Sequence, residues 1–249
     1  MNQSVIKALK LLELFNEDVE ELSLKEIADE GNIPKPTAYR LLSSLEYSGY
    51  IARTNEVQGG KYQLGLKLLE LGNLVANRLE VREVALPLMQ QLAKEINEVI
   101  HLVIVNQNKA TYIEKVESSR ALRLYTKIGK SVPLYIGSGP KLLLAFLPEE
   151  KQQQIIHQSR LISIQRPINK EELVKELQQI KADGFAYSIA EQDEDTTGIS
   201  YPIYNYKRKV IAALAVSGLS SRFTGDNLQR IKHKSSISAE NISKQLGYK

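Results

Sequence analysis

Residues 36–48 combine apolar side chains on one face of a predicted helix with hydrogen-bonding side chains on the other. Leu41, Leu42 and Leu45 recur at helical spacing and form the apolar stripe. The opposite face carries one long base, two phenols and short hydroxyl side chains, namely Thr37, Tyr39, Arg40, Ser43, Ser44 and Tyr47. Lys35 stands at the start of this helix, where backbone N–H groups and the helix dipole favour a phosphate. Such a helix is suited to contact base edges in the major groove of DNA.

The neighbouring elements would hold this helix in a fixed frame. They are a helix over residues 23–30, which precedes it, and strands over 50–53 and 61–64, which follow it. Ser23 and Glu26 have the spacing of a capping box, and Gly59-Gly60 supplies the turn between the strands. This order predicts a winged helix-turn-helix, with Arg53 and Lys61 on the wing.

Charge is distributed unevenly along the chain. The net charge is +4, yet residues 1–80 hold nine Lys or Arg against twelve Asp or Glu. Within residues 31–65 the balance reverses, with four basic residues and two acidic ones. We interpret the seven acids between residues 17 and 30 as a solvated face turned away from DNA. DNA binding therefore depends on basic side chains focused on one face.

Composition excludes several classes of protein. The chain has 249 residues, 43% of them hydrophobic and 25% charged, which is typical of a globular protein. It has no cysteine, so disulfides, thiolate nucleophiles and Cys-containing zinc sites are excluded. No apolar run approaches the roughly 20 residues that span a bilayer. We expect a cytoplasmic protein with no membrane association and no cofactor. The three histidines are scattered along the chain, so we also expect no metal site.

The remainder of the chain predicts an α+β protein with an antiparallel-type sheet. The pattern of residues 66–79 predicts a helix with apolar side chains on more than one face, so part of it should contact another element or another chain. Further helices are predicted over residues 84–96, 137–147, 149–159, 169–183 and 224–246. Strands are predicted over residues 99–105, 110–116, 121–128, 185–190, 198–204 and 210–218. We divide the chain into residues 1–65, a linker helix of 66–80, and a second domain of 81–249.

A ligand pocket is predicted in the second domain, beside the start of the helix that begins near Ser138. Gly137, Ser138 and Gly139 would expose backbone N–H groups there. Tyr125 and Tyr135 can wall a small cavity. The alternative is a packed core without a cavity. Ser138 lacks the G-x-S-x-G spacing of a nucleophile, and we interpret residues 191–195 as a solvated acidic loop.

Several stretches together resemble the IclR family of bacterial transcription regulators. The matching segments are residues 23–28, 33–42, 62–65, 129–145, 183–186, 190–191, 202–203 and 212–218. The resemblance covers essentially the whole chain. It implies a winged helix-turn-helix domain, a linker helix and a GAF-like α/β effector-binding domain, assembled into dimers or tetramers.

The polar helix face, the wing, the predicted pocket and this resemblance together indicate site residues. Candidate DNA contacts are Ser23, Lys35, Pro36, Thr37, Tyr39, Arg40, Ser43, Ser44, Arg53, Lys61 and Tyr62. Candidate effector contacts are Tyr125, Tyr135, Gly137, Ser138, Gly139, Ser188, Ile189, Gly198, Ala215 and Ser217. Three positions depart from the family: Pro36 replaces a serine, Tyr135 a histidine and Pro140 a glycine. A small organic acid is one candidate ligand, although Gly198 and Ala215 offer no polar side chain to hold it.

We therefore expect a regulator that binds double-stranded operator DNA as a homo-oligomer and responds to a small metabolite. It is not expected to be an enzyme, and repression is favoured over activation. Two alternatives remain: a metabolic enzyme with a winged-helix appendage, and a regulator that acts on a partner protein.

Overall fold

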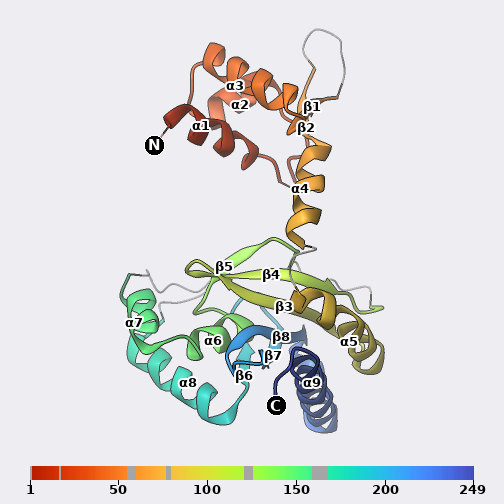
Figure 1. Ribbon diagram of the computed structural model, residues 1–249. Coiled ribbons are helices and arrows are strands. Elements are labelled where there is room, and N and C mark those ends of the chain that lie inside the picture. The colour runs from red at the N-terminus through yellow and green to blue at the C-terminus, as the bar shows by residue number, and fades with distance from the viewer. Residues whose placement is uncertain (1, 17, 55–59, 77–79, 121–125, 159–167) are drawn as a thin grey trace. The chain divides into compact units, whose positions relative to one another are not determined.

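The computed structural model describes residues 2–16, 18–54, 60–76, 80–120, 126–158 and 168–249 (Figure 1). The chain separates into two compact units, Met1–Arg78 and Leu79–Lys249. Among the described residues, none of the helices is both long enough and apolar enough to cross a membrane.

The first unit is built from three helices, a two-stranded hairpin and a fourth helix. Its elements are α1 (Gln3–Leu12), α2 (Leu24–Glu30), α3 (Lys35–Tyr47), β1 (Ile51–Arg53), β2 (Tyr62–Leu64) and α4 (Leu66–Ala76). β1 and β2 pair antiparallel. The hydrophobic core of the first unit contains Leu11, Phe15, Leu22, Ile27, Leu42, Leu45, Ile51 and Tyr62. The predicted winged helix-turn-helix is confirmed, and the leucine stripe of α3 holds that helix against the core.

Local hydrogen bonds explain where the first helices begin. The capping box is confirmed: Glu26 N–H donates to Ser23 Oγ (3.3 Å), and Ser23 N–H donates to Glu26 Oε2 (2.7 Å). The Ser23 N–H also holds the pKa of Glu26 below its ordinary value. α1 begins at Gln3, because Asn2 Oδ1 accepts from Ser4 N–H and caps the helix.

The second unit is organised around one antiparallel sheet of six strands in the order β5-β4-β3-β8-β7-β6. The strands are β3 (Val99–Asn106), β4 (Lys109–Val116), β5 (Ser131–Pro133), β6 (Ala186–Ile189), β7 (Thr196–Tyr204) and β8 (Val210–Leu219). The long hairpin β7–β8 is the one predicted from sequence. β5 was not predicted, and residues 126–128, expected in a strand, are not in one. The rest of that predicted strand, 121–125, lies outside the described residues.

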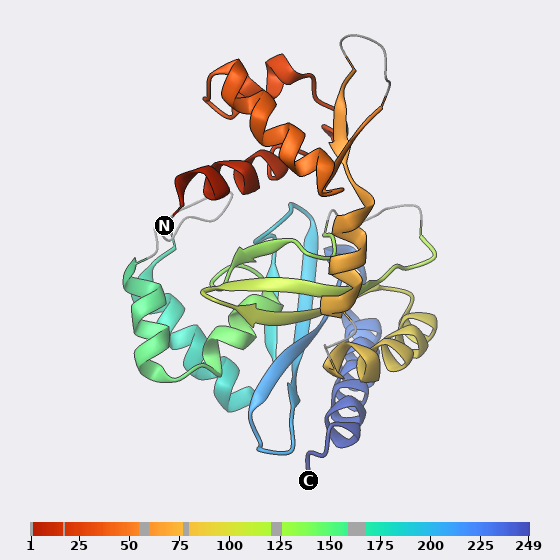
Figure 2. The same ribbon diagram turned by 45° about the horizontal axis from the view of Figure 1, so that its top comes forward.

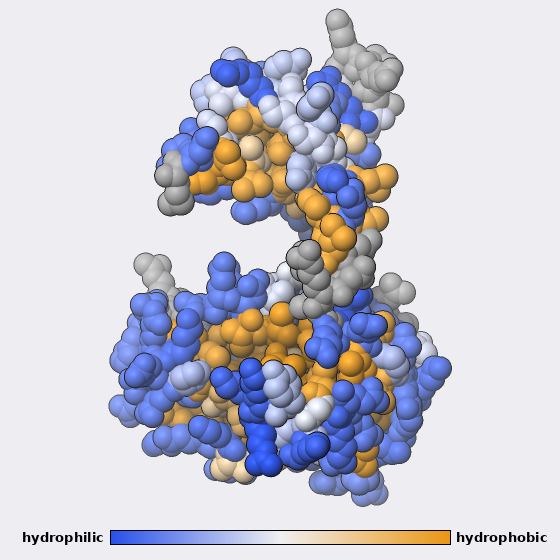
Figure 3. All heavy atoms as spheres, in the orientation of Figure 1, coloured by the Kyte–Doolittle hydropathy of each residue, from blue (hydrophilic) through white to orange (hydrophobic). Residues whose placement is uncertain are grey.

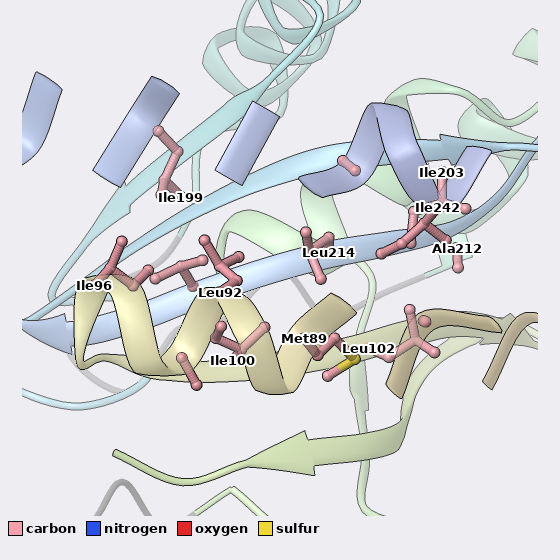
Figure 4. Packing of buried hydrophobic residues seen from close by; sticks show 14 of the residues in the cluster. Met89, Leu92, Ile96, Ile100, Leu102, Ile199, Ile203, Ala212, Leu214 and Ile242 are labelled. Carbon is pink, nitrogen blue, oxygen red and sulfur yellow. The ribbon is translucent and has the colours of Figure 1, made fainter. Parts of the chain in front are cut away.

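Two layers of helices cover opposite faces of this sheet (Figure 2). On one face, α5 (Glu80–Ile96) and α9 (Gly225–Gln245) pack on the sheet through aliphatic side chains including Met89, Leu92 and Leu214 (Figure 4). On the other face lie α6 (Ser138–Ala145), α7 (Glu149–Gln158) and α8 (Lys170–Asp183). A short 3₁₀ turn, Ser220–Arg222, precedes α9. Every residue of α6 is buried, so its start lies inside the fold.

The core contact of α3 predicts a stability difference between two leucines. Leu42 is 0% exposed, whereas Leu64 at the end of β2 is 46% exposed. Leu42→Ala should lower the free energy of unfolding of the first unit by about 2–5 kcal/mol, because it leaves a cavity. Leu64→Ala, the matched control, should change it by less than about 1 kcal/mol. Urea unfolding followed by circular dichroism measures both, and equal effects would show that α3 is not held by this core.

Candidate nucleic-acid interface and ligand pocket

The outer face of α3 presents most of its predicted contact residues to solvent. Lys35, Pro36, Arg40 and Ser44 are exposed, and Tyr39 is half-exposed at 50%. Thr37 and Ser43 are partly exposed. The Arg40 guanidinium makes no hydrogen bond or ion pair with the part of the chain that the structure describes. α3 therefore offers a free cation in the middle of a polar face.

Two hydroxyl groups on α3 are already engaged as donors. Ser43 Oγ donates to the carbonyl oxygen of Tyr39 (2.9 Å), and Ser44 Oγ donates to that of Arg40 (3.1 Å). Both oxygens can still accept a hydrogen bond, which suits base amino groups better than phosphate. Ser23 differs, because its Oγ accepts in the capping box and its hydroxyl proton stays available to donate.

On the wing, two of the predicted DNA contacts, Tyr62 and Arg53, interact with the rest of the first unit. Tyr62 is only 2% exposed, and burial raises the pKa of its phenol. Its ring lies in the core of the first unit, so the prediction of a direct DNA contact was wrong. Arg53 is exposed but is paired within the unit: its Nε lies 3.1 Å from Glu46 Oε1, and its guanidinium lies 5.1 Å from the centre of the Tyr62 ring. Lys61 is exposed just before β2. Gly59 lies outside the described residues.

A pocket in the second unit lies at the buried start of α6, between that helix, the sheet and the segment after β6. Its lining is mostly hydroxyl groups and glycines: Tyr112, Thr126, Gly137, Ser138, Gly139, Pro140, Ser188, Glu191, Gln192, Asp193, Thr196, Thr197, Gly198, Ala215 and Ser217. Seven of the ten candidate effector residues, from the start of α6 and from three different strands, are in this set. The free space inside is about 30 Å³, enough for about one water molecule.

Hydrogen bonds between serines fix the floor of the pocket. Ser138 N–H donates to Ser188 Oγ (3.0 Å), and Ser200 Oγ donates to Ser138 Oγ (2.7 Å). A Cβ on Gly198 would lie 2.7 Å from Ser138 Oγ and 3.1 Å from Ser188 Oγ. The absent side chain at Gly198 therefore lets the two serines converge. The Ser138 and Ser188 hydroxyl protons remain available to a ligand.

The other candidate effector residues are not part of this lining. Ile189 is 58% exposed, because alternation along β6 turns it away from Ser188. Tyr135 is 8% exposed and lies in the core beneath α6. The structure therefore does not bring these two predicted contacts to the pocket. Tyr125 lies outside the described residues.

Sequence reasoning missed the residues that fill the pocket. The Tyr112 hydroxyl donates to Gln192 Oε1 (3.3 Å), while Gln192 Nε2 lies within hydrogen-bond distance of that hydroxyl and donates to the carbonyl oxygen of Ile136, both at 3.1 Å. A Cβ at Gly137, whose φ is 87°, would lie 2.6 Å from Gln192 Nε2. The Gln192 amide thus occupies space that the glycine leaves open. The period-two pattern of 110–116 contained the only sequence signal for Tyr112.

A buried ammonium ties the pocket to its surroundings. Lys141 is 2% exposed and pairs with Glu176 of α8 and with Glu191. Glu191 Oε2 also accepts from Gly137 N–H (2.7 Å). The Gly137 N–H, which was predicted to bind a ligand, is therefore already bonded to the protein itself.

His101 lies beside these residues on β3, opposite Ala215 of β8. Its ring packs edge-on against Tyr112 at 5.2 Å between centroids. Neither ring nitrogen has a hydrogen-bond partner in the described residues. Burial, helped by the charge of Lys115, lowers its pKa to about 3, so the ring is neutral at physiological pH.

Family models match nearly the whole chain in two segments. Residues 4–54 match the IclR helix-turn-helix domain, and residues 73–244 match the model described as "Bacterial transcriptional regulator IclR C-terminal".

Relatives match over their full length. The chain is 37% identical to the HTH-type transcriptional regulator KipR of Bacillus subtilis and 31% identical to XynR of Escherichia coli, each alignment covering 99% of this chain and 98% of the relative. The crystal structure of the Thermotoga maritima IclR superimposes with a TM-score of 0.81 at 27% identity, covering 98% of this chain and 99% of that one. The chain belongs to the IclR family of bacterial transcriptional regulators.

Proposed function

We propose that this protein regulates transcription by binding operator DNA through α3 and the wing, and that a small molecule in the pocket at the start of α6 changes that binding. The observation that carries the DNA part is the exposed polar face of α3, with the unpaired Arg40 at its middle. Lys35 and Pro36 extend this face over the first turn, and Lys61 would add a phosphate contact from the wing.

The relatives support a ligand for the second unit. An IclR homolog from Microbacterium hydrocarbonoxydans has been solved in complex with 4-hydroxybenzoate, and it shares this fold with a TM-score of 0.83 at 22% identity. To change DNA binding, a ligand in the second unit must favour one conformation of the protein over another. The coupling between ligand binding and DNA binding is typically worth about 1–3 kcal/mol. Repression is our preferred direction, in keeping with the relatives named as repressors in Escherichia coli and Salmonella typhimurium.

The chain should act as a homo-oligomer. On α4, Leu66, Leu69 and Leu74 are 82%, 62% and 52% exposed, and Leu66 and Leu69 are neighbours on the helix surface. Figure 3 shows hydrophobic side chains gathered on the surface of α4. Exposed leucines at this spacing are typical of a helix that packs against a second copy of the chain.

The first alternative, an enzyme with a winged-helix appendage, needs a set of catalytic groups in the second unit. The described polar groups of the pocket are bonded mainly to one another, and relatives over the full length are named as transcriptional regulators. The regulator is therefore the function that the geometry supports best.

Arg40→Ala should weaken operator binding by about 1–3 kcal/mol if the guanidinium contacts a base edge. The measurement is a gel-shift titration with the region upstream of the gene. Arg208→Ala, at an exposed hairpin tip in the second unit, is the matched control and should bind normally. Equal affinities for all three proteins would contradict the role of Arg40.

Lys61→Ala should weaken binding to every DNA sequence alike, because a phosphate contact carries no base information. The slope of log K against log salt should fall by about one unit. Fluorescence anisotropy at several salt concentrations, with an operator and an unrelated duplex, measures both effects. A loss confined to one base position would contradict the assignment to phosphate.

Replacing Leu69 and Leu74 together by Glu should produce monomers, since two charges cannot be buried in an apolar interface without partners. Val174→Glu on α8, where the apolar side chain is 41% exposed, controls for the charge alone. Sedimentation velocity reports the oligomeric state. A double variant that sediments like the wild-type oligomer would show that α4 is not the interface.

A further inference from the structure

The effector pocket is already occupied by the chain itself. The Gln192 amide spans it, with hydrogen bonds to the Tyr112 hydroxyl and to the carbonyl oxygen of Ile136. Only about 30 Å³ remains free beside it. A ligand larger than water must therefore displace the Gln192 side chain and satisfy the groups that Gln192 leaves.

Those groups require a hydrogen-bond donor. The carbonyl oxygen of Ile136 can only accept, and the Tyr112 hydroxyl can both accept and donate. A hydroxyl or amide group replaces the amide of Gln192 at both positions. A carboxylate cannot donate to the partly buried carbonyl oxygen of Ile136 and would leave that acceptor without its partner.

Charge around the pocket also disfavours an acid. Glu191 and Asp193 are in the lining, whereas the described lining contains no Lys, Arg or His. The nearby ammonium of Lys141 is shared between Glu191 and Glu176. One positive group, the Lys141 ammonium, therefore lies near three carboxylates, those of Glu176, Glu191 and Asp193. A ligand carboxylate would meet like charge in a partly buried place, where repulsion is screened weakly.

The remaining lining is suited to hydroxyl groups. Ser138 and Ser188 each accept one internal hydrogen bond and keep a proton to donate. Thr197 Oγ1 donates to Ser220 Oγ (2.8 Å) and can still accept. Ser217 is partly exposed and opens on the same space. Donors and acceptors that alternate in this way match a molecule with several hydroxyl groups, each of which both donates and accepts.

We infer, on the basis of the proposed function, that the ligand of this pocket is an uncharged polyhydroxylated small molecule of the polyol or neutral-sugar class, and that it enters by displacing Gln192. Glu191 acts as a selectivity residue: its carboxylate accepts from Gly137 N–H, the place where an acid would otherwise bind.

The test compares pairs of probes that differ by one carboxylate. Isothermal titration calorimetry on the full chain uses glucitol against gluconate and glycerol against glycerate. The neutral member of a pair should bind at least about tenfold more tightly. Glu191→Gln should narrow that ratio, because it removes one negative charge without changing the shape of the side chain. Glu171→Gln, on the exposed first turn of α8, is the matched control and should keep the wild-type ratio.

A second variant tests the displacement. Gln192→Ala should bind the neutral probe several-fold more tightly, because the ligand no longer competes with the amide. Gln178→Ala, exposed on α8, is its control. A purely structural Gln192 would instead lower the melting temperature and leave probe affinity unchanged. That result would overturn the displacement.

The outcomes separate this inference from the proposed function. Tighter binding of gluconate or glycerate than of its neutral partner would overturn the ligand class and leave a ligand-responsive regulator. Failure of all four probes to bind would also overturn the class. Operator binding, measured on the same preparations by gel shift, reports on the regulatory function independently.

Discussion

The second unit depends on the buried ammonium of Lys141. A charge 2% exposed is stable only when it is paired, and here two carboxylates from different segments converge on it. Glu176 joins α6 to α8, and Glu191 joins α6 to the segment after β6. Because Glu191 also accepts from Gly137 N–H, the same pair fixes the start of α6. The pocket exists because these three segments are held together.

The first unit follows a simpler constraint. α3 must bury Leu42 and Leu45 to be held at all, and an amphipathic helix that does so necessarily turns its other face to solvent. The polar residues on that face are therefore available for DNA without further arrangement. The same core takes in Tyr62, and Arg53 lies over the Tyr62 ring, so part of the wing serves structure before recognition.

Periodicity and caps were enough to predict most elements. The capping box at Ser23, the helix ended by Gly184 and the β7–β8 hairpin depend on neighbouring residues, and such local signals are visible in a sequence. Ser138 was predicted from the helix start, whereas Ser188 and Ser217 were predicted through family resemblance, because the meeting of these residues is a property of the sheet order. Gln192 and Tyr112 are 80 residues apart and carry no motif, so nothing local indicates their contact. Which of Ser188 and Ile189 faces the pocket could be decided only from the register of β6 in the sheet.

The central claim is that this chain recognises one DNA sequence as a symmetric regulator. Nuclease footprinting of the full chain on the region upstream of its gene, with excess unrelated duplex present, tests this most directly. Because two copies would each place an α3 in the major groove, the account predicts a protected, pseudo-palindromic site with half-sites about one helical turn, or a multiple of it, apart. Uniform protection that disappears with competitor DNA would contradict the account.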